Sequence, residues 1–351
     1  MENKPQKKCL TWDIISDYRG VLMGIAILAI IIFHYTDDCR MANINYSGWT
    51  LFYNKWISSS SVDTFLFLSG FGLYYSMKKK PDVRTFYKRR FIKILIPYLL
   101  IATPALIWRD LFFSDLGVKV FLKDISFITF FTEGKTWFWY ILMICFCYLI
   151  FPYIFRLVES CSDEEMEDMR MMSIFTFFTL IAMMIQKYDD QLFGFINIAL
   201  LRIPVFFFGC FIGRRAYEKR TIKTGVFLMM IFSIFLAQLR LVNKVVIVRH
   251  VLAFLNLSIC LLIILILNQI KGLKVLHNSI VKFFEWFGKY SLELYLMHVT
   301  VRSVMSNYKY LTCYPKYELI MVAITLILSV IVKLLTNLIT NSLIPAIHHA
   351  K

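Results

Sequence analysis

Long apolar stretches alternate with short polar segments along the whole chain, and this pattern predicts about ten membrane helices. The stretches cover residues 21–36, 60–77, 91–113, 137–155, 172–186, 196–213, 225–239, 245–267, 284–305 and 318–339. Apolar runs near 20 residues are typical of helices that cross a bilayer. We therefore expect an all-α, polytopic integral membrane protein. The whole chain, 1–351, is interpreted as a single transmembrane domain with a short N-terminal segment, 1–18, and a short tail, 340–351.

Composition supports the membrane interpretation. Hydrophobic residues make up 59% of the chain and charged residues 18%, with 33 Phe, 19 Tyr and 7 Trp. A soluble domain is nearer 45 to 50% apolar and about 25% charged. The net charge of +16 could suit nucleic acid. However, Lys and Arg cluster between the apolar stretches, so we expect a lipid bilayer and no nucleic acid as partner.

The basic residues also predict an orientation. Two dense runs follow the second and sixth apolar stretches, and their members are Lys78, Lys79, Lys80, Arg84, Lys88, Arg89, Arg90 and Lys93, then Arg214, Arg215, Lys219, Arg220 and Lys223. Basic loops favour the cytoplasmic side, so ten helices would place both termini in the cytoplasm. The N-terminus shows no cleavable signal peptide. We expect a multi-pass protein of the cell membrane, specifically the bacterial cytoplasmic membrane.

The first apolar stretch is flanked by two polar residues on one face. It reads YRGVLMGIAILAIIIFHY over 18–35, with Arg19 near one end and His34 near the other. A helix would separate them by about 22 Å and about 60° of rotation. Polar side chains on one helix face are unfavourable in contact with lipid, so this face should lie against protein or water. The helix is therefore a candidate wall of an active site. The alternative is that Arg19 is only a charged anchor and His34 only an interfacial residue.

Three further residues are expected at the depth of His34. Asp63 begins the second stretch, while Trp137 and Trp139 begin the fourth. A carboxylate beside an imidazole can fix its tautomer and raise its basicity. The alternative is that the two polar residues never meet. The two Trp rings could hold a sugar, or could be interfacial belt residues.

Six segments in order resemble the membrane acyltransferase 3 family. Besides the first helix they are VDTFLFLSGFGLYYS, FYKRRFIKILIPY, TWFWYILMICFCYLIFPYIF, RIPVFFFGCFIG and FGKYSLELYLMH. The family's first helix carries a basic residue, ten residues and then His. Here that strict spacing falls on Met23, and the nearest basic residue is Arg19, one turn further along. The resemblance covers nearly the whole chain.

The resemblance implies transfer of an acyl group, usually acetyl, from acetyl-CoA to a hydroxyl of an extracytoplasmic glycan or lipid-linked glycan. His34 and Asp63 would be the catalytic residues, with His34 acting as a base or accepting the acyl group. The residues expected to hold the donor are Arg19, Ser69, Arg89, Arg90 and Lys93. Acetyl-CoA enters as a substrate, and no metal is expected, because the cysteines lack metal-ligand spacing. The acceptor glycan is not identified by the sequence.

Several polar residues inside apolar stretches remain open. Glu293 and His298 are candidate substrate contacts or members of a buried network. Arg202 could pair with Glu293 or Asp63. Ser69 lies beside Gly70 and Gly72, which could make room for the donor or let helices pack closely. A disulfide between Cys39 and Cys313 is possible, since both are expected in outer loops.

Two other functions remain open at this point. A carrier of an anionic or glycosidic solute could also use intramembrane charges, with Arg19 and His34 as substrate or proton sites. No repeated pair of broken helices or inverted repeat is visible, which favours the enzyme. The departure at Met23 could also mark a noncatalytic member of the family.

Overall fold

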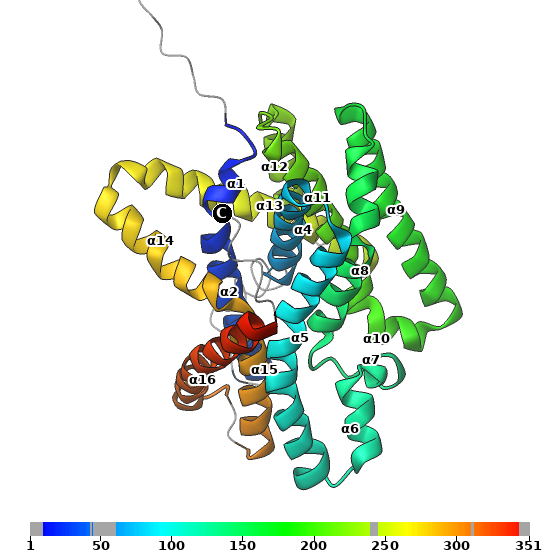
Figure 1. The fold of residues 1–351 in the computed structure, drawn as a ribbon, viewed down its shortest axis with the longest axis vertical. Helices are drawn as coiled ribbons and strands as arrows, with labels where there is room; N and C mark the ends of the chain where they lie inside the picture. The colour runs from blue at the N-terminus through cyan, green and yellow to red at the C-terminus, as the bar shows by residue number, and fades with distance from the viewer. Residues whose placement is uncertain (1–9, 43, 45–60, 239–244, 310–311, 344–351) are drawn as a thin grey trace, which may run out of the picture.

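The computed structural model describes residues 10–42, 44, 61–238, 245–309 and 312–343, and this part of the chain is almost wholly helical (Figure 1). The helices are α1 (Ile14–Asp17), α2 (Arg19–Met41), α4 (Ser61–Lys79), α5 (Val83–Ile107), α6 (Val118–Ile125), α7 (Ile128–Thr132), α8 (Trp139–Glu159), α9 (Glu164–Tyr188), α10 (Asp190–Leu200), α11 (Ile203–Tyr217), α12 (Thr224–Gln238), α13 (Val245–Gln269), α14 (Lys274–Lys289), α15 (Ser291–Asn307) and α16 (Pro315–Leu343). A π-helix, η2 (Trp108–Phe113), extends α5, and a 3-10 turn, η3 (Ile270–Gly272), follows α13. The described residues form no strand, so the predicted all-α fold is confirmed.

Seven helical stretches of the described chain are long and apolar enough to cross a membrane. They are Ile14–Met41, Val83–Phe113, Trp139–Glu159, Glu164–Tyr188, Asp190–Tyr217, Arg249–Gly272 and Pro315–Leu343. The protein is therefore a multi-pass membrane protein, but the figure of about ten spans is not confirmed. Among the predicted stretches, α4 carries Asp63 and terminal lysines, and α12 has only 15 residues.

Two predicted stretches are each divided into two helices. The stretch 196–213 breaks between α10 and α11, where Pro204 occupies the first turn of α11. Proline has no N–H to donate and is best tolerated in that turn. The stretch 284–305 breaks at Tyr290, the residue between α14 and α15. In Figure 1 the start of α14 projects from the bundle, whereas its last turns pack closely on α2, and α15 runs beside α2, α5 and α16.

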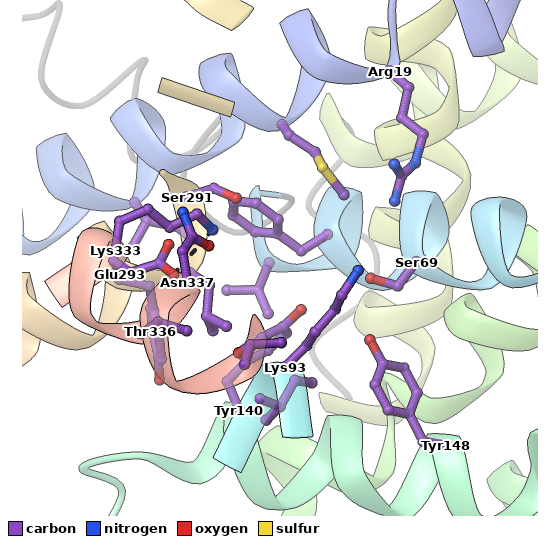
Figure 2. Close-up of a pocket in the computed structure, with 18 residues that line it drawn as sticks. Arg19, Ser69, Lys93, Tyr140, Tyr148, Ser291, Glu293, Lys333, Thr336 and Asn337 are labelled. Atoms are coloured by element: carbon purple, nitrogen blue, oxygen red, sulfur yellow. Dashed lines mark hydrogen bonds and ion pairs between the residues drawn. The ribbon is translucent and has the colours of Figure 1, made fainter. Parts of the chain in front are cut away.

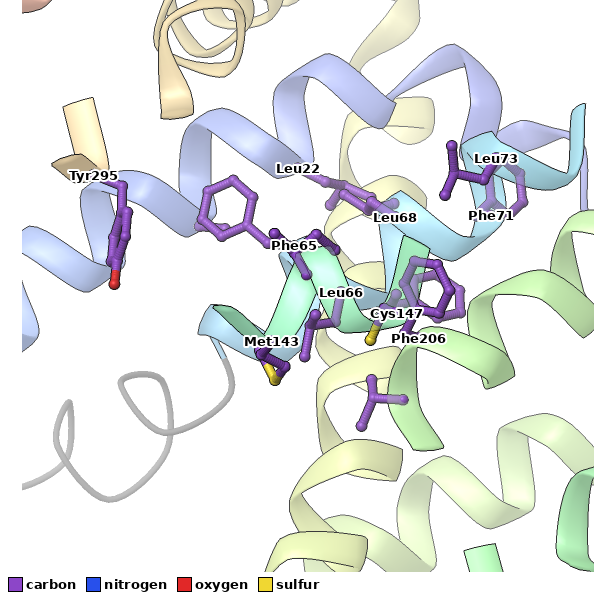
Figure 3. Packing of buried hydrophobic residues seen from close by; sticks show 14 of the residues in the cluster. Leu22, Phe65, Leu66, Leu68, Phe71, Leu73, Met143, Cys147, Phe206 and Tyr295 are labelled. Carbon is purple, nitrogen blue, oxygen red and sulfur yellow. The ribbon is translucent and has the colours of Figure 1, made fainter. Parts of the chain in front are cut away.

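Glycines bring two pairs of helices into close contact. A Cβ added at Gly70 of α4 would lie 1.9 Å from the Phe206 carbonyl oxygen of α11, and one at Gly24 of α2 would lie 1.8 Å from the Phe284 carbonyl oxygen of α14. Only glycine permits such an approach in either pair. Figure 3 shows the apolar core that fills the space between α2, α4, α8 and α11, including Phe206. The packing alternative for Gly70 is therefore confirmed.

Charged residues gather at one end of the bundle, which we call the basic end. It holds the start of α2 and the ends of α4, α8 and α11. Glu167 of α9 is fully buried there and pairs with Arg214 at 3.2 Å and with Arg215 and Arg220 at 3.0 Å. Lys78 of α4 pairs with Glu159 of α8. The predicted acidic and basic loops thus lie at the same end.

Candidate active site

A cavity of about 330 Å3, here called the basic-end cavity, lies among α2, α4, α5, α8, α15 and α16. Its polar lining residues are Arg19, Ser69, Lys93, Tyr140, Tyr148, Ser291, Glu293, Lys333, Thr336, Asn337 and Thr340. Figure 2 shows the tips of Ser69, Lys93 and Tyr148 pointing toward one another, with Arg19 on the same side. Four residues predicted from the sequence, Arg19, Ser69, Lys93 and Glu293, therefore meet in one cavity.

Arg19 is fixed in place by α4. Its Nε donates a hydrogen bond to the Leu68 carbonyl oxygen at 3.1 Å. Its guanidinium lies against Gly72, where an added Cβ would be 3.0 Å from three guanidinium atoms. Gly72 therefore makes room for Arg19, unlike Gly70, which serves helix packing. Met23, at the family's strict spacing, lines the same cavity one turn along α2.

Two of the three cations that line this cavity, Arg19 and Lys93, have no carboxylate partner within the described chain, while Lys333 is paired with Glu293. No described carboxylate pairs with Arg19 or Lys93, nor with Arg89 and Arg90, which lie one turn before Lys93 on α5. Neither Arg89 nor Arg90 lines the cavity itself. Cations within a membrane are costly unless they are paired or bind a ligand. The arrangement therefore suits an anionic group at the basic end.

The wall across from Lys93 is formed by α15 and α16. Glu293 of α15 is almost completely buried and pairs with Lys333 of α16, with Nζ and Oε1 separated by 3.1 Å. Its second oxygen, Oε2, has no hydrogen-bond partner among the described residues. Glu293 is thus on a cavity wall as expected, although Lys333 rather than Arg202 is its partner.

A second cavity of about 880 Å3, the opposite-end cavity, surrounds the far end of α2. Its polar and aromatic lining includes His34, Asp37, Asp38, Thr136, Trp137, Trp139, Arg202, Arg249, Arg302, Ser303, Ser306, Asn307 and Thr312. His34, Trp137 and Trp139 were predicted to lie at one depth, and the structure brings them to one cavity.

The two cavities meet at three side chains. Ile30 of α2, Val62 of α4 and Tyr295 of α15 line both of them. The basic-end cavity and the opposite-end cavity therefore adjoin and share part of their walls. Arg19 lies in the first and His34 in the second, so α2 forms a wall of both.

The His34 ring lies beside an imidazole from another helix, α15. The ring of His298 lies 5.2 Å from that of His34, measured between centroids, with a tilt of 35°. Beyond them, Nε of Arg302 donates to Oδ2 of Asp38 at 2.8 Å, and a second guanidinium N–H bonds Oδ1. His298 is fully buried and lines neither cavity, so it lies behind His34 rather than on a wall where substrate could reach it.

The expected pairing of Asp63 with His34 is not formed. Asp63 is almost completely buried and accepts a hydrogen bond from Nε of Arg202 at 3.0 Å, while the described chain offers Nδ1 of His34 no partner. α4 packs against α11 through Gly70, and this turns Asp63 toward the start of α11. Equal depth predicted neither this rotation nor the resulting partner. The suggested Arg202–Asp63 pair is confirmed.

Both tryptophans of the opposite-end cavity have an arginine over the ring. Arg109 lies 4.1 Å from the Trp137 ring centroid, and Arg202 lies 5.3 Å from that of Trp139. Arg109 in turn bonds Asp110 at 2.6 Å and also pairs with Asp124. Each ring therefore has one side occupied by a cation–π contact, which fixes its orientation.

The cavity residues that sequence reasoning missed include Asp38, Tyr148, Arg302 and Lys333. Asp38 and Arg302 follow His34 and His298 by four residues, a spacing that places them on the same helix faces. That spacing was the available signal. Nothing in the sequence distinguishes Tyr148 from the chain's other tyrosines.

The thiols form neither a disulfide nor a metal site in the described chain. Cys39 and Cys313 are both free, and Sγ of Cys39 donates to the Cys313 carbonyl oxygen at 3.6 Å. The described residues also contain no group of three His, Cys, Asp or Glu placed to hold a metal ion.

Comparison with known proteins identifies a family. A family model described as an acyltransferase domain, Acyl_transf_3, matches residues 21–337. The match includes most of each helix that lines the two cavities, but Arg19 and Thr340 lie just outside it. The searches of curated proteins and of solved structures found no significant match.

Proposed function

Because the chain belongs to the acyltransferase 3 family, we propose that it transfers an acyl group, normally acetyl, from acyl-CoA to a hydroxyl of a cell-surface glycan. One observation carries the proposal. Two cavities, one with unpaired cations and one with a histidine, adjoin and share Ile30, Val62 and Tyr295 as part of their walls. This arrangement suits a donor that enters from one end of the bundle and an acceptor that enters from the other.

The donor is placed at the basic end. Coenzyme A carries several phosphate charges, and arginine and lysine are the residues that bind phosphate best in proteins. Arg19 and Lys93 line the cavity, and Arg89 and Arg90 lie one turn away on α5. The arm of the coenzyme would then run along α2 toward His34, a distance of about 22 Å. Ser69 lies on this path.

The acceptor is placed in the opposite-end cavity. At about 880 Å3 it is within the size range of sites that enclose whole ligands. Its hydroxyl, amide and charged groups suit the many hydroxyls of a glycan, while Trp137 and Trp139 offer apolar ring faces. We place this end outside the bacterial cytoplasmic membrane and the basic end in the cytoplasm, as the positive-inside rule favours.

His34 is the proposed catalytic residue, by either of two routes. In direct transfer, one ring nitrogen takes the proton of the acceptor hydroxyl while its oxygen attacks the thioester carbon. The C–S bond breaks, and the proton passes to the departing thiolate, which gives an ester and free coenzyme A. Alternatively, the imidazole displaces the thiolate first and then passes the acyl group to the hydroxyl. Asp63 would act only indirectly, by holding Arg202 at the cavity wall.

The test is transfer of label from radiolabelled acetyl-CoA to the glycan fraction of membranes that contain the protein. We expect His34→Ala to reduce the rate by about 10²- to 10⁴-fold at equal protein level. His250→Ala is the matched control, because His250 is another intramembrane histidine and lines neither cavity. Unchanged transfer by His34→Ala would remove His34 from the chemistry. No transfer by the intact protein would favour a carrier or a noncatalytic member.

A further inference from the structure

His298 presents an unusual buried group. Its side chain has 0% exposure, and both ring nitrogens lack a hydrogen-bond partner among the described residues. A buried polar group without a partner destabilises the folded protein, so native structures retain few of them. The His34 ring lies 5.2 Å away between centroids, and its Nδ1 also has no partner in the described chain.

An ion pair one turn away fixes the distance between these two rings. Asp38 follows His34 by four residues on α2, and Arg302 follows His298 by four residues on α15. The two guanidinium bonds of Arg302 to Asp38 therefore join the helices directly beside the imidazoles. Thr312 adds a third hydrogen bond to the same carboxylate. The two cross-helix contacts, His34–His298 and Asp38–Arg302, therefore lie one helical turn apart between α2 and α15.

We propose that His298 is a positioning residue for His34, with its ring nitrogen accepting the N–H of His34 that faces away from the substrate. The Asp38–Arg302 pair keeps the two rings in register. This inference rests on the proposed acyl transfer and replaces the expectation that Asp63 orients His34. His298 cannot bind substrate directly, because it lines neither cavity.

The chemistry explains why a second imidazole suits this position. When His34 takes the acceptor's proton, both of its ring nitrogens carry hydrogen. The nitrogen away from the substrate then needs an acceptor, and a neutral imidazole supplies one. A carboxylate would accept more strongly, but burying its charge at a site with no exposure costs far more. The proton later leaves with the thiolate, so His298 ends the cycle unchanged.

The test compares two replacements of His298 in the full chain. His298→Leu fills the space with an apolar side chain of similar size and removes the hydrogen-bond acceptor. His298→Gln replaces the acceptor nitrogen by an acceptor oxygen. We expect Leu to lower kcat about 100-fold and Gln to recover at least about tenfold of that loss. KM for acetyl-CoA should stay within about twofold, because the donor cavity is not touched. His250→Leu is the control, because His250 is a half-buried imidazole that is hydrogen-bonded instead to the Thr179 hydroxyl.

A second readout needs no catalysis. Diethyl pyrocarbonate reacts with the free imidazole nitrogen, and mass spectrometry gives the rate for His34. We expect slower modification of His34 in His298→Leu than in the native protein or His298→Gln.

Two results would overturn the proposal. In the first, kcat of His298→Leu stays within about twofold of the native value. The same conclusion holds where His298→Gln has a kcat no higher than that of His298→Leu, and kcat and KM change together in both variants. In the second, the native protein transfers no label and modification of His34 is equally fast in all three proteins. If the native protein transfers no label but the modification rates differ as expected, the acyl-transfer proposal fails alone and the pairing of the two imidazoles stands.

Discussion

Replacing Arg19 by Gln tests whether the basic-end cavity binds the acyl donor. Arg19 is half-buried, is held by the Leu68 carbonyl and has no carboxylate partner in the described chain. Its charge is therefore available to a ligand. A hydrogen bond to a charged group contributes about 1.5 to 3 kcal/mol, and 1.4 kcal/mol corresponds to a factor of ten. We predict that Arg19→Gln raises the Kd of coenzyme A by about 10- to 100-fold.

Two related variants grade the effect. Arg19→Lys keeps the charge but loses the planar fork that matches phosphate, so its Kd should lie between native and Gln. Gly72→Ala does not change the Arg19 side chain itself, but it puts a Cβ 3.0 Å from the guanidinium, which must then shift. Its Kd should also rise, by less than that of Arg19→Gln.

The assay is equilibrium binding of coenzyme A to the purified full-length protein at fixed ionic strength. Arg40→Gln is the matched control, because Arg40 lies at the opposite end of the same helix, exposed and paired with Asp37. An Arg19→Gln protein that binds coenzyme A as tightly as Arg40→Gln would refute the placement of the donor at this cavity.

Three further predictions concern the scaffold. Asp63→Asn should leave the Arg202 charge buried without its partner and cost about 3 to 5 kcal/mol of stability in thermal unfolding. The double variant Asp63→Asn with Arg202→Gln should recover most of this loss. A double variant whose loss of stability is the sum of the two single losses would contradict the reasoning. Gly209→Ala should separate α11 from α4, because the added Cβ would lie 2.0 Å from a carbonyl oxygen, at a cost of about 1 to 3 kcal/mol; a native melting temperature would show that the contact is dispensable. The Thr85 hydroxyl and N–H hold the pKa of Asp82 below its usual value. The carboxylate therefore stabilises the first turn of α5 above its unfolded pKa, and this contribution is lost as pH falls through the lower folded pKa. The hydrogen-exchange protection factor of that turn, which corrects for the intrinsic effect of pH, should therefore fall at acid pH in the native protein but not in Asp82→Asn.

The sequence predicted the helices well because the bilayer imposes a strong pattern. Each of the ten apolar stretches is mostly helical where described, and seven helical stretches are long and apolar enough to cross a membrane. The two divided stretches had different signals. Pro204 marks the break before α11, whereas the break at Tyr290 follows from the packing of Gly288 on Gly20, where an added Cβ would lie 2.1 Å from a carbonyl oxygen. Such a tertiary contact leaves no local trace in the sequence.

The candidate site was predicted in its parts but not in its pairings. Helix periodicity placed Arg19 and His34 on a shared face, and both line cavities along α2. Depth alone then paired His34 with Asp63. The rotation of α4 is set by its glycine contacts with α11, so Asp63 meets Arg202 instead. Rotation about a helix axis is a property of the packed bundle, and one helix's sequence does not determine it.

The partition at Ile30, Val62 and Tyr295 has a consequence for the permeability of the membrane. Each of these side chains lines both cavities, so single side chains form the shared wall at this point. Tyr295 is packed edge to face on Tyr140, at 5.4 Å between ring centroids, which braces this wall from the α8 side. With the two cavities open to opposite faces of the membrane, as proposed above, we expect a smaller side chain at any of the three positions to join them and to let ions leak across the membrane.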